Sequence, residues 1–254
     1  MKDTIYTIPL TDAFKANDEC PFCYIMRKLE QDALSFILGC AYMEDDIRAE
    51  TDKTGFCSHH YKKMYEYGNR LGTALMLHTH YVAMQKELKK HLDDFSPTRR
   101  SVLDRLKKRK LSEDSKTSSL SSWLQSQTNS CYVCHSIEQN YGRYIDTFFH
   151  LIKTNSEFYE LYKNGKGFCL PHFRDIVDQA ESKLSDAQKE SFYSILFAQM
   201  QDNLKRIEDD LSWFIDKFDY KNKHANWKTS QDAIPRGIQK LASIYVQDEP
   251  FKEK

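Results

Sequence analysis

The chain has 254 residues, and its 37 Lys and Arg side chains are matched by 37 Asp and Glu side chains, so the formal net charge is zero. A neutral chain has no overall field that attracts nucleic acid or anionic lipid, and binding to either would need a local patch. Only 8 Gly and 6 Pro are present, a composition that favours long helices over many short strands. No stretch reaches the roughly 20 apolar residues of a membrane span, and residues 1–19 lack the apolar run of a signal peptide. These features predict an all-α protein that we expect in the cytoplasm, with no membrane partner.

The first part of the chain, residues 1–95, is predicted to hold two long helices after a short extended piece at residues 5–10. Apolar residues recur every three or four positions over residues 22–40, which is typical of an amphipathic helix. Cys40 falls on this apolar stripe, so we expect it to be a core thiol. A longer helical pattern follows over residues 58–92, with a bend expected near Gly72, and Ser96-Pro97 ends it.

Residues 96–130 have a different composition and predict a linker. A basic cluster between Arg99 and Lys110 is followed by a Ser-rich stretch. A short helix is expected over residues 101–110, and the remainder is predicted to be a mobile connection.

The second part of the chain repeats the plan of the first. Helices are predicted over residues 137–152, 157–162 and 169–184, and the strongest apolar stripe runs from Phe192 to Phe218. A tail with a last helix over residues 230–245 closes the chain. We therefore expect a first helical unit at 1–95, the linker at 96–130, a second helical unit at 131–221 and a tail at 222–254.

Each of the two units carries one copy of the same signature, C-x2-C followed by G-F-C-x2-H. The potential ligands are Cys20, Cys23, Cys57 and His60 in the first copy, and Cys131, Cys134, Cys169 and His172 in the second. Cys57 follows Cys20 by 37 positions (57 minus 20), and Cys169 follows Cys131 by 38 (169 minus 131). The near-equal spacing indicates one unit that has been duplicated.

Three thiols and one imidazole form the ligand set of a closed tetrahedral zinc site. We expect each copy to build its own site from a C-x2-C hairpin and a C-x2-H at a helix start, with two zinc ions per chain. His59 is an alternative to His60, and His135 is a possible additional ligand. An iron–sulfur cluster would use the same thiols, although it usually requires four cysteines, and the thiols could also be unrelated core residues.

Four protein ligands leave zinc no open position for water or substrate, which favours a structural role over a catalytic one. The sequence therefore predicts a binding or adaptor module stapled by two metal ions, and it assigns no catalytic residue. The alternative is a thiol-based redox sensor or enzyme in which oxidation releases the metal.

Two further segments suggest partners. The cluster from Arg99 to Lys110 could contact nucleic-acid phosphates, although it has no aromatic residue for base stacking and is also typical of a solvated linker. In the tail, Trp227, Ser230, Asp232 and Arg236 form a possible ligand or partner surface, with Ser230 as the expected N-cap of the last helix. The simpler interpretation is a terminal helix docked on the bundle. The long apolar stripes could also pack against a second copy of the chain.

These motifs together resemble a bacterial family of unknown function found in Firmicutes. The resemblance rests on C-P-x-C at Cys20, the M-E-D-D-I-R segment at residues 43–48, G-F-C-x2-H-H-Y at residues 55–61, G-F-C-L-P-H-F at residues 167–173, and the 227–241 tail. It covers nearly the whole chain except the linker. It implies a bacterial, cytoplasmic, metal-binding helical protein, and it transfers no activity and no catalytic residue.

Overall fold

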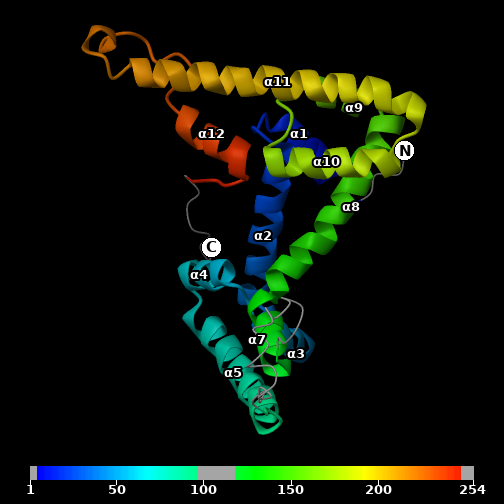
Figure 1. The fold of residues 1–254 in the computed structure, drawn as a ribbon, viewed down its shortest axis with the longest axis vertical. Coiled ribbons are helices and arrows are strands. Elements are labelled where there is room, and N and C mark those ends of the chain that lie inside the picture. Colours follow the sequence, from blue (N-terminus) through cyan, green and yellow to red (C-terminus); the bar gives the residue numbers. More distant parts are fainter. Residues whose placement is uncertain (1–4, 97–117, 247–254) are drawn as a thin grey trace, which may run out of the picture. The chain divides into compact units, whose positions relative to one another are not determined.

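The computed structural model describes residues 5–96 and 118–246, and in these ranges every regular element is a helix (Figure 1). The all-α prediction is therefore confirmed. Contacts between residues divide the chain into two compact units, with residues 1–31 and 137–249 in one and residues 32–136 and 250–254 in the other. We call these unit 1 and unit 2. Helix α2, Pro21–Gly39, and helix α8, Tyr132–Thr154, both cross this division along the chain.

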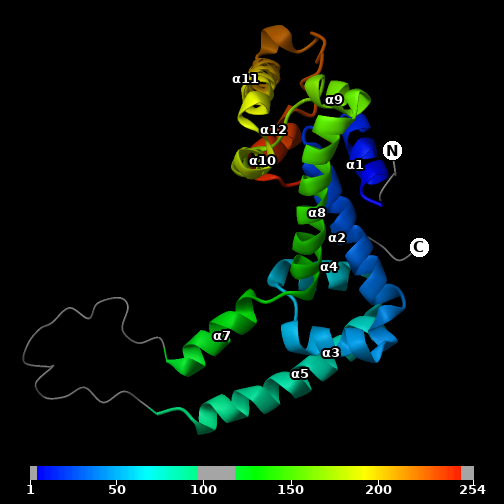
Figure 2. The ribbon, with the colours of Figure 1, turned by 90° about the vertical axis from the view of Figure 1, so that its right-hand side faces the viewer.

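Unit 1 combines helices from the first and the second half of the chain. It contains α1 (Thr7–Lys15), the start of α2, most of α8, α9 (Ser156–Lys163), α10 (Leu170–Lys183), α11 (Asp186–Asp216), a 3-10 turn (Tyr220–Asn222) and α12 (Ala233–Ala242). The long helix α11 has α10 and α12 along the same side (Figures 1 and 2). Helix α12 packs on both α10 and α11, and α1 packs on α9.

The core of unit 1 is aromatic and centres on Phe148, which is fully buried. Its ring contacts those of Phe14, Phe22 and Phe168 with centroid separations of 5.7, 5.7 and 5.9 Å. Large rings at edge-to-face and stacked angles remove much apolar area from water and restrict the packing geometry. Because Phe22 and Phe168 lie next to predicted metal ligands, this core also positions the C-x2-C and G-F-C segments.

Unit 2 contains the end of α2, a 3-10 turn (Ala41–Met43), α3 (Asp45–Thr54), α4 (Ser58–Tyr67), α5 (Arg70–Asp93) and α7 (Ser119–Asn129). Helix α5 packs on α3, α4 and α7. The expected single helix over residues 58–92 is wrong, because the chain breaks at Gly68, which has φ +102°. Asn69 then caps α5 by accepting a hydrogen bond from the Gly72 N–H at 2.8 Å, so Gly72 lies in the first turn of α5 and bends nothing.

Other local predictions also need correction. An extended piece was expected over residues 5–10, but residues 7–10 form the start of helix α1, which continues to Lys15. Helix α7 occupies the end of the expected linker. Helix α7 begins where Ser118 accepts a hydrogen bond from the Ser121 N–H, a capping signal inside a Ser-rich stretch that resembles a linker in composition. Cys40 is exposed at the end of α2 and is not a core thiol. The basic cluster from Arg99 to Lys110 lies outside the described residues.

Candidate metal centres

All four ligand segments lie at helix N-termini. Cys57 and Cys169 are the N-cap residues of α4 and α10, with His60 and His172 in the first turns. Cys20 and Cys131 immediately precede α2 and α8, whose first turns contain Cys23 and Cys134. The C-x2-C segments are therefore helix starts and not the expected hairpins. Unpaired N–H groups and the positive end of the helix dipole stabilise thiolates at such positions.

Cluster 1 consists of Cys20, Cys23, Cys169 and His172, all of them buried in unit 1. The His172 Nδ1 atom lies 3.4 Å from the Cys20 sulfur, 3.5 Å from the Cys23 sulfur and 3.1 Å from the Cys169 sulfur. The sulfurs of Cys23 and Cys169 are 3.5 Å apart. The four atoms therefore surround one small volume.

Cluster 2 consists of Cys57, His60, Cys131 and Cys134 in unit 2. Here the His60 Nδ1 atom lies 3.2 Å from the Cys57 sulfur, 3.2 Å from the Cys131 sulfur and 3.4 Å from the Cys134 sulfur. The sulfurs of Cys57 and Cys134 are 3.8 Å apart. His59 and His135 belong to neither of these four-residue groups, so the preference for His60 agrees with the structure.

The sequence-based pairing of these ligands is wrong. We expected each C-x2-C to share a site with the next C-x2-H, whereas the structure joins Cys20 and Cys23 to the second C-x2-H, and Cys131 and Cys134 to the first. The two groups follow the division of the chain into units. Cys20, Cys23, Cys169 and His172 all belong to unit 1, and Cys57, His60, Cys131 and Cys134 all belong to unit 2. Each C-x2-C segment therefore shares a compact unit with the C-x2-H segment of the other copy.

The geometry of both clusters fits a tetrahedral metal ion. Metal–sulfur and metal–nitrogen bonds of zinc length place two sulfurs about 3.8 Å apart and a sulfur and a nitrogen about 3.6 Å apart. The observed separations, 3.1 to 3.8 Å, lie at or slightly below these values. Each cluster thus has the donor set and the size to hold one metal ion.

Electrostatics in cluster 1 also indicate a cation. Burial raises the pKa of Cys20, and the hydrogen bond with Cys169 raises the pKa of Cys23 to about 12. Hydrogen bonds from Cys20 and Cys23 lower the pKa of Cys169. Like charges at this distance oppose one another, so a thiolate at Cys169 disfavours ionisation of Cys20 and Cys23. A dication at the centre would allow all three to ionise.

Cluster 2 has the same division between its thiols. Burial raises the pKa of Cys131, but hydrogen bonds involving the His60 ring and the backbone of Cys134 and Cys57 outweigh burial and lower it to about 6. Burial and the charge of Cys131 raise the pKa of Cys134. Cluster 2 is also more open, because Cys134 is exposed and Cys57 is half-buried.

Glycine turns deliver the C-x2-H segments to both clusters. Gly55 has φ +58° and ψ −156°, a conformation available almost only to glycine, and Gly167 has φ +71°. A Cβ atom at Gly55 would lie 2.8 Å from the His80 ring, which is held by a 2.8 Å hydrogen bond between its Nδ1 and the Asp52 carbonyl. A Cβ atom at Gly167 would lie 3.2 Å from the Met200 sulfur. Both glycines are thus required by conformation and by close packing.

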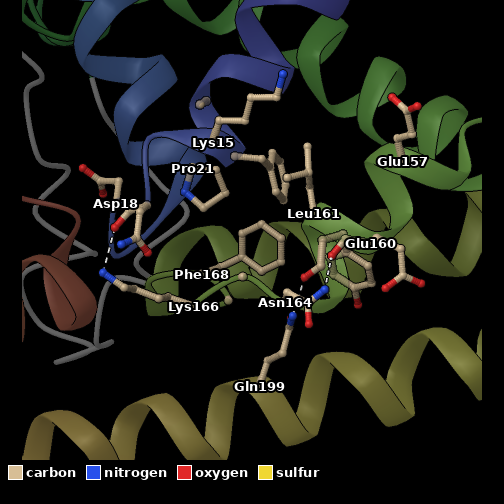
Figure 3. Close-up of a pocket in the computed structure, with 16 residues that line it drawn as sticks. Lys15, Asp18, Pro21, Glu157, Glu160, Leu161, Asn164, Lys166, Phe168 and Gln199 are labelled. Atoms are coloured by element: carbon tan, nitrogen blue, oxygen red, sulfur yellow. Dashed lines mark hydrogen bonds between the residues drawn. The ribbon is translucent and has the colours of Figure 1, made fainter.

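A pocket of about 350 Å³ lies in unit 1 beside the Gly167–Phe168 segment (Figure 3). Gln199 reaches into its wall from α11, and the amide nitrogen donates hydrogen bonds to the Tyr162 carbonyl and, at 2.9 Å, to the Lys163 carbonyl. These bonds hold the end of α9, from which the chain continues to Cys169. Gln199 could not be identified from the sequence, because a single buried glutamine leaves no pattern.

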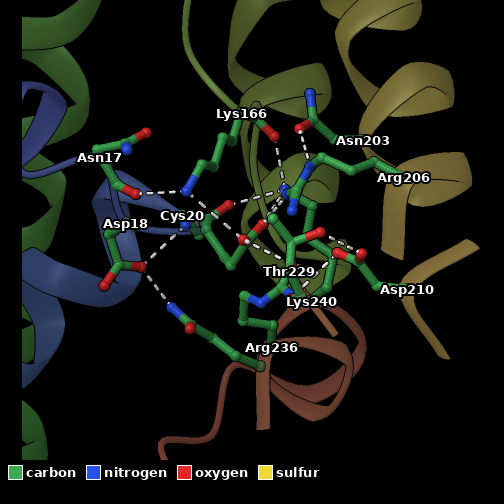
Figure 4. A network of polar contacts seen from close by, with 12 residues as sticks. Asn17, Asp18, Cys20, Lys166, Asn203, Arg206, Asp210, Thr229, Arg236 and Lys240 are labelled. Carbon is green, nitrogen blue, oxygen red and sulfur yellow. Dashed lines mark hydrogen bonds and ion pairs between the residues drawn. The ribbon is translucent and has the colours of Figure 1, made fainter. Parts of the chain in front are cut away.

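A buried polar network lies next to cluster 1 (Figure 4). The Glu19 carboxylate, 3% exposed, pairs with Arg206, with Lys166 at 3.6 Å and with Arg236 at 3.8 Å. The ammonium of Lys240, 1% exposed, lies 3.9 Å from the same carboxylate. Burial lowers the pKa of Lys240, while Glu19 and the Cys20 and Cys169 thiols oppose that effect. Among these residues, only Arg236 was predicted from the sequence as part of a site.

The tail residues predicted as a ligand surface have internal partners. Arg236 pairs with Asp232 at 2.9 Å and with Asp210 at 2.9 Å. Ser230 is fully buried and donates its hydroxyl to the Trp227 carbonyl, so it is not the N-cap of α12, a position that Asp232 occupies. The Trp227 ring packs on Phe214 with centroids 5.5 Å apart. These contacts agree with the simpler interpretation, a terminal helix docked on the bundle.

The fold and these centres define a class of protein, a helical protein whose two Cys3His clusters could each hold a metal ion. Residues 1–248 match DUF6062, a family of unknown function, and the chain belongs to that family. No curated protein and no solved structure matches the chain. Among the described residues, no helix combines the length and the apolar character needed to cross a membrane.

Proposed function

We propose that the protein binds two zinc ions, one in each cluster, and that these ions hold it in a form that acts as a binding or adaptor module. The observation that carries the proposal is the closed shell of four ligands. Each shell joins helix starts from distant parts of the chain, 146 positions apart between Cys23 and Cys169 and 77 between Cys57 and Cys134. Three thiolates and one imidazole suit zinc, whereas an iron–sulfur cluster usually takes four cysteines.

Elemental analysis of anaerobically purified protein tests the metal. We expect about two zinc ions per chain, no visible absorption band, and loss of helical circular dichroism when a strong chelator removes the zinc. A coloured cluster, or a folded chain free of metal, would refute the proposal. The proposal includes a bacterial origin and a cytoplasmic location, which the resemblance of the sequence motifs implies.

The adaptor role is supported by apolar side chains exposed near the end of α11 and on α12. Ile215 is 69% exposed, Phe218 77% and Leu241 61%, and exposed apolar surface of this kind is typical of contact with another protein. Sedimentation of the native protein and of Phe218→Ser distinguishes a homodimer from a monomer that recruits a different protein. If both proteins sediment as monomers, the exposed surface is assigned to a different partner protein. If the native protein is a dimer and Phe218→Ser is a monomer, the surface is assigned to self-association.

Binding of nucleic acid through Arg99–Lys110 also remains a proposal. It predicts a steep loss of affinity with salt, which neutral substitutions at Lys107, Lys108 and Lys110 abolish. Fluorescence anisotropy with labelled single-stranded and double-stranded oligonucleotides measures both effects.

A redox-responsive role is the second candidate, and the exposure of cluster 2 favours it. With hydrogen peroxide as oxidant, the Cys134 thiolate attacks one peroxide oxygen, the O–O bond breaks, and the other oxygen leaves as hydroxide, which takes a proton from solvent to become water. The Cys57 thiolate, 3.8 Å away, then displaces hydroxide from the sulfenic sulfur and forms a disulfide. Two thiolates are oxidised, peroxide is reduced to water, and the zinc loses two ligands. Release of one zinc per chain by peroxide and its return on reduction would support this role, and resistance of both ions would exclude it.

A further inference from the structure

The two clusters are built alike, but one backbone hydrogen bond differs between them. In cluster 2 the Tyr132 N–H donates to the Gly55 carbonyl at 3.0 Å, which ties the C-x2-C segment to the G-F-C segment. The residues at the same motif positions in cluster 1 are Pro21 and Gly167. Proline has no N–H, so cluster 1 cannot form this bond.

Lys240 of α12 makes the corresponding connection in cluster 1. Its ammonium donates to the Glu19 carbonyl at 2.7 Å and to the Lys166 carbonyl at 2.6 Å. Glu19 immediately precedes Cys20, and Lys166 immediately precedes the G-F-C segment of Cys169. One side chain therefore bridges the two segments that supply three thiols and the imidazole. Figure 4 shows Lys240 in the same polar network as Lys166 and Cys20.

The position of Lys240 also suits the charge of an occupied site. Three thiolates and a neutral imidazole around a dication leave one net negative charge in a buried place, where an uncompensated charge is costly. Lys240 brings a buried positive charge, and Glu19 is balanced by Arg206, Lys166 and Arg236. Just past α12, the Ser243 hydroxyl lies 3.1 Å from the Cys23 sulfur, with Ser243 at φ +61°.

We propose that Lys240 is a positioning residue of cluster 1, which replaces the backbone hydrogen bond that Pro21 cannot form and couples docking of α12 to retention of the metal ion. The inference rests on the proposed metal occupancy of cluster 1. It concerns a different property, the rate at which the ion leaves.

The test follows zinc transfer from the full-length protein to a coloured chelator under anaerobic conditions. Two phases are expected, a fast one from the more open cluster 2 and a slow one from buried cluster 1, identified by its absence in Cys169→Ser. Lys240→Met should speed the slow phase about 10- to 100-fold, the range for loss of hydrogen bonds to a charged group, and leave the fast phase unchanged. Lys205→Met, which removes an exposed lysine of α11, is the matched control and should change neither phase.

Pro21→Ala gives the proposal its sharper test, because alanine restores an N–H opposite Gly167. In this background Lys240→Met should accelerate the slow phase several-fold less than it does with Pro21 present. If Lys240→Met alone does not fold, Pro21→Ala is added to it. Recovery of a folded, zinc-loaded chain then supports the proposal that Lys240 replaces the missing backbone hydrogen bond, and failure to recover overturns the proposal.

Three results would overturn the inference: an unchanged slow phase in Lys240→Met, equal acceleration of both phases, or an effect of Lys240→Met that is the same with alanine at position 21. A wild-type chain that starts with no zinc in cluster 1 is a separate result, since it refutes the proposed occupancy itself.

Discussion

The crossed pairing of ligands makes a numerical prediction about zinc content. The double variant Cys23→Ser/Cys169→Ser removes two ligands from one cluster, so the chain should keep one zinc ion. The double variant Cys23→Ser/Cys57→Ser removes one ligand from each cluster, so both ions should be lost or bound weakly. Pairing within each sequence copy predicts the opposite result for each variant.

The size of the stability change follows from the length of chain that each ion closes. A cross-link over the 146 positions between Cys23 and Cys169 reduces the entropy of the unfolded chain by an amount worth about 5 kcal/mol at 25 °C, and one over the 77 positions between Cys57 and Cys134 by about 4.5 kcal/mol. Pairing within each copy would close loops of nearly 40 residues, worth about 4 kcal/mol. Loss of cluster 1 should thus destabilise the chain slightly more than loss of cluster 2.

The assay combines elemental analysis of anaerobically purified variants with urea unfolding followed by circular dichroism. The four single variants Cys23→Ser, Cys57→Ser, Cys134→Ser and Cys169→Ser serve as controls, each expected to weaken one site. One zinc ion kept by Cys23→Ser/Cys57→Ser, together with none kept by Cys23→Ser/Cys169→Ser, would refute the crossed arrangement.

Three further predictions concern stability measured by urea unfolding. Gly55→Ala should lower the free energy of unfolding by about 1–3 kcal/mol through backbone strain, and further through the clash with the His80 ring. Its control, Gly142→Ala, has open space within α8 and should raise the free energy of unfolding by about 0.5–1 kcal/mol. Equal effects of the two substitutions would contradict the strain assigned to Gly55. Phe148→Ala should lower the free energy of unfolding by about 3–5 kcal/mol. Its control, Phe218→Ala at an exposed position, should lower it by less than about 0.5 kcal/mol. A small loss at Phe148 would contradict the tight packing described for the aromatic core. Burial raises the pKa of Asp210, but hydrogen bonds from Thr229 and Arg236 hold the pKa below its usual value. The ionised carboxylate therefore stabilises the fold above a pH of about 4, and this stabilisation is lost as the pH falls through the lower pKa of the folded state. Asp210→Asn should reduce the fall in the free energy of unfolding below a pH of about 4, and an unchanged fall would contradict the prediction.

The ligand types and the helix starts at the two C-x2-H segments could be predicted from the sequence, whereas the helix starts at the C-x2-C segments could not. Cys57 and Cys169 each precede a helical pattern, and a thiol at an N-cap next to C-x2-H is a strong local signal. His60 was preferred to His59 because it matches His172 in the other copy, and the structure agrees. These conclusions needed only local spacing, which a single sequence contains.

The pairing of the ligands could not be predicted in the same way. Four half-sites of two kinds can combine within a copy or between copies, and both choices satisfy the chemistry of zinc equally well. The division of the chain into units decides between them, because α2 begins in unit 1, beside Cys20, and ends in unit 2, the unit that contains Cys57 and His60. Local spacing does not show that the helix predicted over residues 22–40 runs from one unit into the other, so the pairing within each copy was the simpler expectation.

The difference between Pro21 and Tyr132 was nevertheless visible in the sequence. When a motif is duplicated, a position where one copy loses a backbone donor marks a hydrogen bond that must be replaced from elsewhere. In this chain the replacement comes from Lys240, more than 200 positions away, in a helix whose apolar pattern indicates only docking. Through the contacts of Lys240, α12 is part of the structure around cluster 1, although its sequence gives no sign of a connection to the metal ligands. A chain shortened before α12 should therefore lose zinc from cluster 1 faster than the full-length chain does, with the rate for cluster 2 unchanged, and an unchanged rate for cluster 1 would contradict this assignment.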